Sequence, residues 1–237
     1  MSEFEVIGKR ILNVRSGPKA IGQAIYTDDI KFPNMLYGKI LRSPFPHARI
    51  INIDISKAKA HPGVRGIVTG QDVPRIKVGA LPTQSDRPIM AIDKVRHVGE
   101  PVAALVAVDE EIAEEAIELI KVDYEALPAV FDPEEAIKPG APRIHDECQN
   151  NISFKFVKSY GDTQKGFHES DYVREDTFYS QPVNHAAIEP HGVISQWNND
   201  GTLTVWIDIQ MPFLIQRAFA RVFNLPFISA AFIYLQV

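Results

Sequence analysis

The chain of 237 residues contains a single cysteine, Cys148, so it cannot form an internal disulfide. The polar residues around Cys148 offer no second thiol for an iron–sulfur or zinc site. Positive charge is also sparse, because Lys and Arg never occur in runs longer than two and the net charge is −5. These absences argue against a nucleic-acid partner.

Long apolar runs are absent as well, and no segment reaches the length needed to span a bilayer. The beginning of the chain carries acidic side chains where a signal peptide has a positive region and an apolar run. We therefore expect no membrane span and a cytoplasmic location.

Three common functional motifs are missing from the sequence: GxGxxG, GK[ST] and GxSxG. Their absence argues against a dinucleotide fingerprint, a phosphate-binding loop and the nucleophile elbow of a hydrolase. The composition, with 45% hydrophobic and 23% charged residues, is that of an ordinary globular protein. The chain is long enough for one large or two ordinary domains.

The first half of the chain alternates short strands with helices, which indicates an α/β or α+β domain from residue 22 to about 128. Strands are predicted at residues 36–42, 48–55, 64–69, 101–108 and 121–125, with a one-turn helix at 56–61. The almost wholly apolar segment 101–108 is the expected centre of the sheet. The clearest helix follows it, because Asp109 can cap a segment with one apolar stripe and many glutamates.

Prolines and a glycine fill residues 127–151, a composition typical of a linker, with a short helix expected at 133–137. Beyond the linker the pattern favours long strands. We expect strands at 153–157, 172–179, 193–197 and 202–209, a hairpin turn at 198–201, helices after Asp162 and at 212–223, and a final strand in the apolar tail 227–237.

The candidate site lies in residues 180–195, where Glu189 follows His185 at position i+4, about one turn of a helix. The pair could ligate a metal from a helix, but Pro182 and Pro190 flank it and no third ligand follows at zinc spacing. A buried polar pair that orients a loop is the favoured interpretation, with His191 as a possible hydrogen-bond partner. The other five histidines are expected at the surface or in loops.

Four ordered segments together resemble the molybdenum-binding large subunit of the xanthine oxidase family. They are GQAIYTDD at 22–29, LRSPFPHAR at 41–49, DKVRHVGEPV at 93–102 and VDYEALP at 122–128. The resemblance implies an α+β fold in which an α/β-hammerhead domain precedes the incomplete start of the first molybdopterin-binding domain. The implied division is an N-terminal extension (1–18), the hammerhead domain (19–128), a linker (129–151) and the partial molybdopterin-binding domain (152–237).

This resemblance also implies a chemistry, in which molybdenum held by a pterin dithiolene transfers oxygen from water to carbon or removes a hydroxyl group. Electrons pass through iron–sulfur clusters and FAD on partner subunits. The substrate would be an aromatic, heterocyclic, aldehyde or aryl-CoA compound, and the sequence does not choose between hydroxylation and dehydroxylation. Residues 77–81 and 183–185 most resemble 4-hydroxybenzoyl-CoA reductase.

By the same resemblance, Val183, Asn184, His185 and Glu189 lie near the molybdenum cofactor. Family members commonly place a Gln two residues before the His, but this chain has Val183 there, and Gln181 is two residues too early. The hydrogen bond that this Gln makes to a metal ligand is therefore not expected from Val183.

Relatives in this family continue well past the point that matches Val237, so we expect this chain to be an N-terminal part of the subunit. It would need a C-terminal molybdopterin-binding region, and alone it should neither hold the cofactor nor turn over substrate. The alternative is a truncated, non-catalytic interaction module. Burying the six large apolar residues of the tail would contribute about 10 kcal/mol, so the tail should pack, pair with another chain or promote aggregation.

Overall fold

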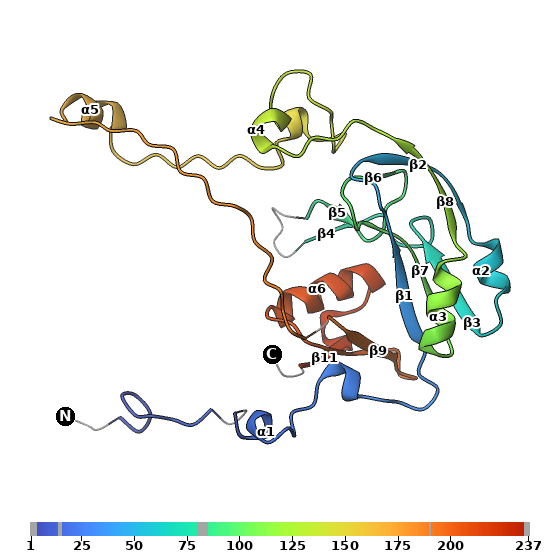
Figure 1. Cartoon of the computed structure of the whole chain (residues 1–237). Helices are drawn as coiled ribbons and strands as arrows, with labels where there is room; N and C mark the ends of the chain where they lie inside the picture. The colour runs from blue at the N-terminus through green and yellow to red at the C-terminus, as the bar shows by residue number, and fades with distance from the viewer. Residues whose placement is uncertain (1–3, 14–15, 80–84, 190, 235–237) are drawn as a thin grey trace.

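The computed structural model describes residues 4–13, 16–79, 85–189 and 191–234 (Figure 1). Most helices and strands gather in one body, and two extended segments reach away from it. One is the beginning of the chain, and the other carries the short helix α5 (Thr163–His168) at its far end. The observed helices and strands agree with the α+β class expected from the sequence.

A three-stranded antiparallel sheet forms the centre of the first domain. It has the order β1 (Tyr37–Arg42), β7 (Pro101–Ala107) and β3 (Val64–Thr69). The central strand β7 is largely buried, as its apolar sequence predicts. Its position at the centre of the sheet is confirmed.

Two helices cover this sheet, α3 (Glu110–Ile117) and α2 (Ser56–Ala60). The predicted cap of α3 is present, because the Asp109 side chain accepts a hydrogen bond from the Ile112 backbone N–H at 2.8 Å. The glutamates of α3 face solvent, and two of them pair with Lys39 of β1. The amphipathic pattern of the sequence therefore sets the orientation of this helix.

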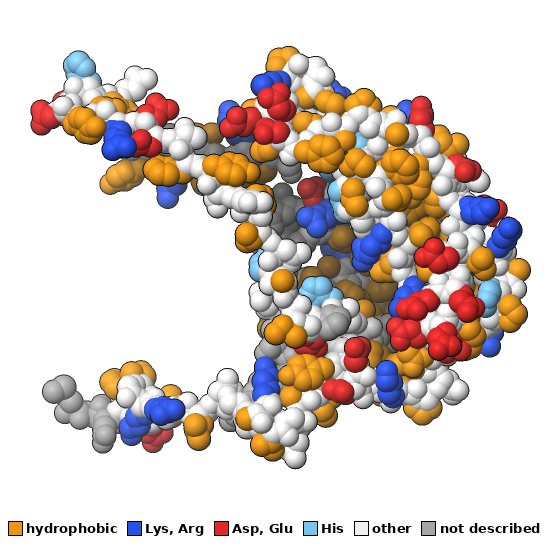
Figure 2. All heavy atoms as spheres, viewed as in Figure 1, with side chains coloured by type: hydrophobic (Ala, Val, Ile, Leu, Met, Phe, Trp, Pro, Cys, Tyr) orange, Lys and Arg blue, Asp and Glu red, His pale blue; other side chains and the backbone are white. Residues whose placement is uncertain are grey.

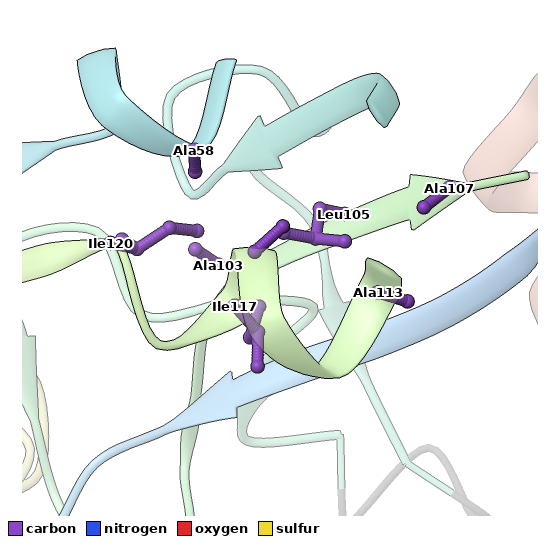
Figure 3. Close-up of a cluster of buried hydrophobic side chains, with 8 residues drawn as sticks. Ala58, Ala103, Leu105, Ala107, Ala113, Ile117 and Ile120 are labelled. Atoms are coloured by element: carbon purple, nitrogen blue, oxygen red, sulfur yellow. The ribbon is translucent and has the colours of Figure 1, made fainter. Parts of the chain in front are cut away.

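Small side chains dominate the core between α2, α3 and the sheet (Figure 3). The buried residues of this core are Ala58, Ala103, Leu105, Ala107, Ala113, Ala116, Ile117 and Ile120. Alanines at these positions allow the helices to pack close to β7, while the larger residues fill the space between them.

A second sheet has the order β6 (Lys94–Val95), β2 (Ala48–Asp54) and β8 (Lys121–Ala126). A separate two-stranded ribbon joins β4 (Lys77–Val78) and β5 (Arg87–Pro88). A smaller buried cluster of Ala48, Ala91, Val95 and Val102 connects the second sheet to β7.

His47 lies in the bend just before β2, so it is in a loop, one of the two positions expected for it, but it is only 4% exposed and not at the surface. Its Nδ1 lies 2.6 Å from the carbonyl oxygen of Pro128, and its backbone carbonyl accepts from the Leu127 N–H at 2.9 Å. The two contacts of His47 therefore hold the residues that directly follow β8, at the end of the first domain. A local sequence pattern does not reveal this contact because the two residues are far apart in the chain.

The linker contains the expected short helix, α4 (Pro133–Ala136), capped by Asp132. A later turn, η3 (Gln149–Asn151), ends at a residue that holds the linker together. The Asn151 amide donates to the carbonyl oxygens of Ala136 and Pro142, each at 2.9 Å. Ion pairs between Lys94 and Asp146 and between Lys77 and Glu147 attach this loop to the first domain.

The strands predicted at 153–157 and 172–179 are wrong for this structure. Both segments are extended, but the structure assigns no strand to either and gives no hydrogen bond from their backbone to another described strand. A strand needs a partner, and none of the described residues provides one here. Between them, α5 forms as predicted, and Asp162 caps it by accepting from the Lys165 N–H at 3.0 Å.

After residue 192 a third sheet forms, with the order β11 (Ala230–Tyr234), β10 (Leu203–Ile207) and β9 (Val193–Trp197). The predicted hairpin turn between β9 and β10 is confirmed, with Asn198 N–H donating to the Thr202 carbonyl at 2.8 Å. β11 runs parallel to β10 after the crossover helix α6 (Pro212–Phe223).

The apolar tail packs in part. Ala230 is fully buried in β11, whereas Phe227 is 43% and Ile228 87% exposed. Leu235 and Val237, for which burial or pairing was also expected, lie outside the described residues.

The N-terminal part of the chain passes beside the third sheet. It includes α1 (Ser16–Ala20) and the single turn η1 (Thr27–Asp29). The ring of Phe32 lies 4.8 Å from that of Trp206 in β10, which connects this segment to the sheet. Among the residues that the structure describes, no helix is long and apolar enough to cross a membrane.

Candidate functional site

A hollow of about 560 Å³ lies where the extended segment meets the third sheet. One side is formed by Ala187 and residues 191–193, and the other by residues 207–211. The second group spans the end of β10 and the residue before α6, which begins at Pro212. The fold thus brings the segment containing His185 and Glu189 to the end of a strand and the beginning of a helix.

Pro212 explains why the chain turns from β10 into α6 at this hollow. Proline has a φ suited to the first helical position and needs no backbone partner for a missing N–H. Met211 before it provides no side-chain cap, so the first N–H groups of α6 are not satisfied by that residue. The positive end of this helix dipole favours a negatively charged or hydrogen-bond-accepting group nearby.

Glu189 is the predicted site residue that contacts the folded body. It accepts a hydrogen bond from the backbone N–H of Thr27 in η1. Partial burial, together with the negative charges of Asp208 and Asp28, raises the pKa of Glu189 above its ordinary value. Two acidic side chains from separate parts of the chain, Asp28 and Asp208, therefore act on Glu189, and Asp208 also lines the hollow.

Thr27 itself is 6% exposed, and its hydroxyl Oγ1 has no hydrogen-bond partner among the described residues. Gly192 packs directly against it, since a Cβ built on Gly192 would lie 3.0 Å from the Thr27 Cγ2. A glycine at this position allows the segment after Glu189 to approach η1 closely.

Val183, Asn184 and His185 lie apart from Glu189, in contact with solvent, and Val183 is 88% exposed. Asn184 Oδ1 accepts from the Ala186 N–H at 2.9 Å, which forms a local turn with Ala186 at a φ of +47°. The segment is not helical, so the spacing does not bring His185 and Glu189 onto one helix face. The expected buried pair is wrong in this structure, because His185 is exposed and Glu189 is only partly buried.

His191 lines the hollow, next to Gly192, and Gln210 lines it from the stretch between β10 and α6. The sequence pattern pointed to His191 but not to Thr27, Asp208 or Gln210. The sequence could have indicated two of these residues as site candidates. Asp208 and Gln210 are polar residues between an apolar strand and a proline that starts a helix. Thr27 had no such signal, because only the tertiary fold places it beside Glu189.

The described residues contain no group of three His, Cys, Asp or Glu side chains that could hold a metal ion. A metal that brings its own sulfur ligands on an organic cofactor does not need such a group. The hollow offers His191 and Gln210 as polar contacts and the beginning of α6 as a partly positive edge. These residues could contact one side of a bound cofactor, but they do not surround it.

A second, smaller hollow of about 280 Å³ lies against the linker and includes His145 and Cys148. Burial, reinforced by the positive charge of Arg96, lowers the pKa of His145. Cys148 is a free, partly buried thiol. This hollow is far in sequence from the predicted site residues and shares no lining residue with the first.

Two family models match the chain. The aldehyde oxidase and xanthine dehydrogenase a/b hammerhead domain matches residues 21–128, and the molybdopterin cofactor-binding domain matches residues 144–229. The two matches cover both the first domain and the region that contains the candidate site.

Several known proteins are similar to the chain in sequence, and two of them illustrate the match. A probable xanthine dehydrogenase subunit of Bacillus subtilis is 38% identical over 208 residues, which cover 88% of this chain and 28% of that protein. The nicotinate dehydrogenase large molybdopterin subunit of Eubacterium barkeri is 34% identical over 225 residues, which cover 94% of this chain and 52% of that protein. The chain therefore spans between about a quarter and a half of these relatives.

Solved structures show the same fold. The crystal structure of quinoline 2-oxidoreductase from Pseudomonas putida 86 superposes with a TM-score of 0.87 at 30% identity, covering 99% of this chain and 31% of that one. The Cu,Mo-CO dehydrogenase gives a TM-score of 0.85, also at 30% identity, covering 97% of this chain and 31% of that one.

Proposed function

Because the chain belongs to the molybdenum-binding large subunits of the xanthine oxidase family, we propose that it forms one part of a molybdenum-cofactor oxidoreductase. The observation that carries this proposal is the hollow at the start of α6, which lies inside the region matched by the molybdopterin cofactor-binding domain. The hammerhead domain supports this hollow through η1, whose Thr27 contacts Glu189 and Gly192.

In this proposal the residues around the hollow bind and orient the cofactor. His191 and Gln210 provide polar contacts, and the beginning of α6 offers N–H groups to an accepting group. A bound molybdenum–pterin cofactor supplies oxygen-transfer and electron-transfer chemistry. Glu189 holds a proton more readily than an ordinary glutamate because of its partial burial and its acidic neighbours. A position near the cofactor for Val183, Asn184, His185 and Glu189 remains part of the proposal.

In this proposal the chain has four parts. They are an N-terminal extension (1–18), the hammerhead domain (19–128), a linker (129–151) and a partial molybdopterin-binding domain (152–237). The whole enzyme would act on an aromatic, heterocyclic, aldehyde or aryl-CoA substrate, by hydroxylation or by reductive dehydroxylation. An iron–sulfur subunit and an FAD subunit would carry its electrons. The names of the relatives as subunits agree with a multi-subunit assembly, and a cytoplasmic location remains a prediction from the sequence.

An interaction module without catalysis is the second candidate, favoured by the exposed extended segment at residues 152–189. The two candidates differ in what the chain does after assembly. The chain should be purified alone and together with the part of the Bacillus subtilis relative that it does not match, and molybdenum should be measured in each sample. Assembly with molybdenum and substrate-dependent dye reduction supports the enzyme, whereas assembly without molybdenum supports the module.

A further inference from the structure

The stretch that carries His191 enters the third sheet from an open side of the molecule. It is the end of the long extended segment, and β9 begins shortly after it, at Val193. The space-filling view shows the molecule concave between its two extended segments (Figure 2). The place of His191 in the hollow therefore depends on the contacts that its neighbours make with the folded body.

Two neighbours of His191 contact the same residue, Thr27 of η1. Glu189, two residues before His191, accepts a hydrogen bond from the Thr27 N–H. Gly192, directly after His191, lies against the Thr27 side chain, because a Cβ built on Gly192 would lie 3.0 Å from Cγ2 and 3.4 Å from Cβ of Thr27. His191 thus lies between two contacts with one residue.

Thr27 is held firmly in its own turn. It is 6% exposed, and two reciprocal hydrogen bonds close η1 around it. The Asp29 N–H donates to the Tyr26 carbonyl at 3.1 Å, and the Tyr26 N–H donates to the Asp29 carboxylate at 2.9 Å. The Thr27 hydroxyl has no hydrogen-bond partner among the described residues, so its N–H and its methyl group make the two contacts beside His191.

The same short segment reaches the opposite side of the hollow. The ring of Phe32 lies 4.8 Å from that of Trp206 in β10. Trp206 directly precedes residues 207–211, which form that opposite side. Residues 27–32 therefore contact both sides of the hollow, at Thr27 and at Phe32, and fix the separation between them.

We propose that Thr27 is a positioning residue of the candidate cofactor site, which fixes His191 opposite Gln210. It acts through Glu189 and Gly192, by its backbone N–H and its methyl group, and it does not line the hollow itself. A residue of the hammerhead domain thereby sets the width of a hollow in the molybdopterin cofactor-binding domain. What the hollow binds rests on the proposed function, whereas the positioning is a property of this chain alone.

A pair of substitutions tests the contact between Thr27 and Gly192. Gly192→Ala brings a methyl group to 3.0 Å from Thr27 Cγ2, so the side of the hollow that carries His191 must move away. The imidazole signals of His191 and the side-chain amide signals of Gln210 should shift in NMR spectra of the 237-residue chain. Thr27→Ser removes Cγ2, and in the double variant these signals should return to their original positions.

A second pair tests the hydrogen bond. Glu189→Ala removes the acceptor and should accelerate amide exchange at the beginning of β9 about two- to tenfold, whereas Glu189→Gln keeps an acceptor oxygen and should leave exchange unchanged. Thr27→Val is the control at Thr27 itself, because it keeps the methyl group and the N–H and removes only the unpartnered hydroxyl. Its His191 and Gln210 signals should match those of the unchanged chain.

The inference is overturned if Gly192→Ala leaves the His191 signals unshifted, if Thr27→Ser does not restore them, or if Glu189→Ala and Glu189→Gln exchange alike. Should Gly192→Ala fail to fold, restoration by Thr27→Ser is measured as recovery of folding.

Molybdenum content is measured separately, as in the test of the proposed function. Restored signals in a chain whose assembly holds no molybdenum uphold the positioning and contradict the proposed enzyme. Unshifted signals in a chain whose assembly holds molybdenum overturn the positioning alone, so the two failures are distinguishable.

Discussion

The guanidinium of Arg221 in α6 donates a hydrogen bond to the backbone carbonyl oxygen of Lys77 in β4, 3.2 Å away. The Lys77 ammonium in turn pairs with Glu147 of the linker. One short strand of the first domain therefore contacts both the linker and the region matched by the molybdopterin cofactor-binding domain. This contact helps to set where α6, and with it the hollow, lies relative to the first domain.

Replacing Arg221 with methionine should loosen that contact while preserving each domain. Because the bond is exposed, we expect a loss of about 0.5–1 kcal/mol in the docking of α6. Amide exchange in α6 and β4 should accelerate. Arg217→Met on the same helix is the matched control, since Arg217 has no hydrogen-bond or ion-pair partner among the described residues. Equal exchange in the two variants would contradict a docking role for Arg221.

His47→Ala should destabilise the first domain by about 1–3 kcal/mol, because it leaves the Pro128 carbonyl without its buried donor and opens a cavity. Thermal or urea unfolding of the chain measures this change. His97→Ala removes an exposed imidazole and should change stability little. A His47 variant as stable as the His97 variant would show that the bond to Pro128 does not hold the end of β8.

Gly70→Ala should be strongly destabilising, because a Cβ at that position would lie 2.2 Å from the Ala91 carbonyl oxygen. The backbone must shift to relieve the clash, at a cost of about 1–3 kcal/mol. Gly66→Ala provides the comparison, since its Cβ would meet only Val106 Cγ2 at 3.5 Å, an ordinary contact. Unfolding curves that coincide for the two variants would refute the predicted close approach.

The contribution of Glu189 to stability should depend on pH. Because burial and the neighbouring acidic side chains raise the pKa of Glu189 in the folded state, this group adds to the stability of the folded chain at pH values below its unfolded pKa, and that contribution is lost as the pH rises through the raised folded pKa. Asp208→Asn removes one of the negative charges that raise it, so the midpoint of Glu189 titration should fall.

Carboxyl carbon shifts measured by NMR across pH would follow that titration. Asp200→Asn is a suitable control because Asp200 lies in the hairpin turn, where its own contacts are with Thr202. An unchanged midpoint in Asp208→Asn would mean that Asp208 does not act on Glu189.

Elements with strong local signals were predictable from the sequence. The apolar strand β7, the Asp109 cap of α3 and the proline that starts α6 each depend on a few neighbouring residues. The strands at 153–157 and 172–179 were predicted wrongly because strand formation requires a partner that this chain does not supply among its described residues.

The candidate site was predictable only in part, for the same reason. Glu189 and His191 stand out in their segment, but their neighbours Thr27 and Asp208 come from other parts of the chain. Two-residue strands such as β4 also escape prediction, because they carry too few residues to show a period. Tertiary contacts, rather than local preference, determine these features.

The most direct test of the proposed function is the molybdenum content of the purified 237-residue chain, measured alone and after assembly with the unmatched part of the Bacillus subtilis relative. The hollow forms one open wall of a cofactor site, so we predict much less than one molybdenum per chain alone and close to one per assembled complex. Stoichiometric molybdenum on the chain alone would contradict this account.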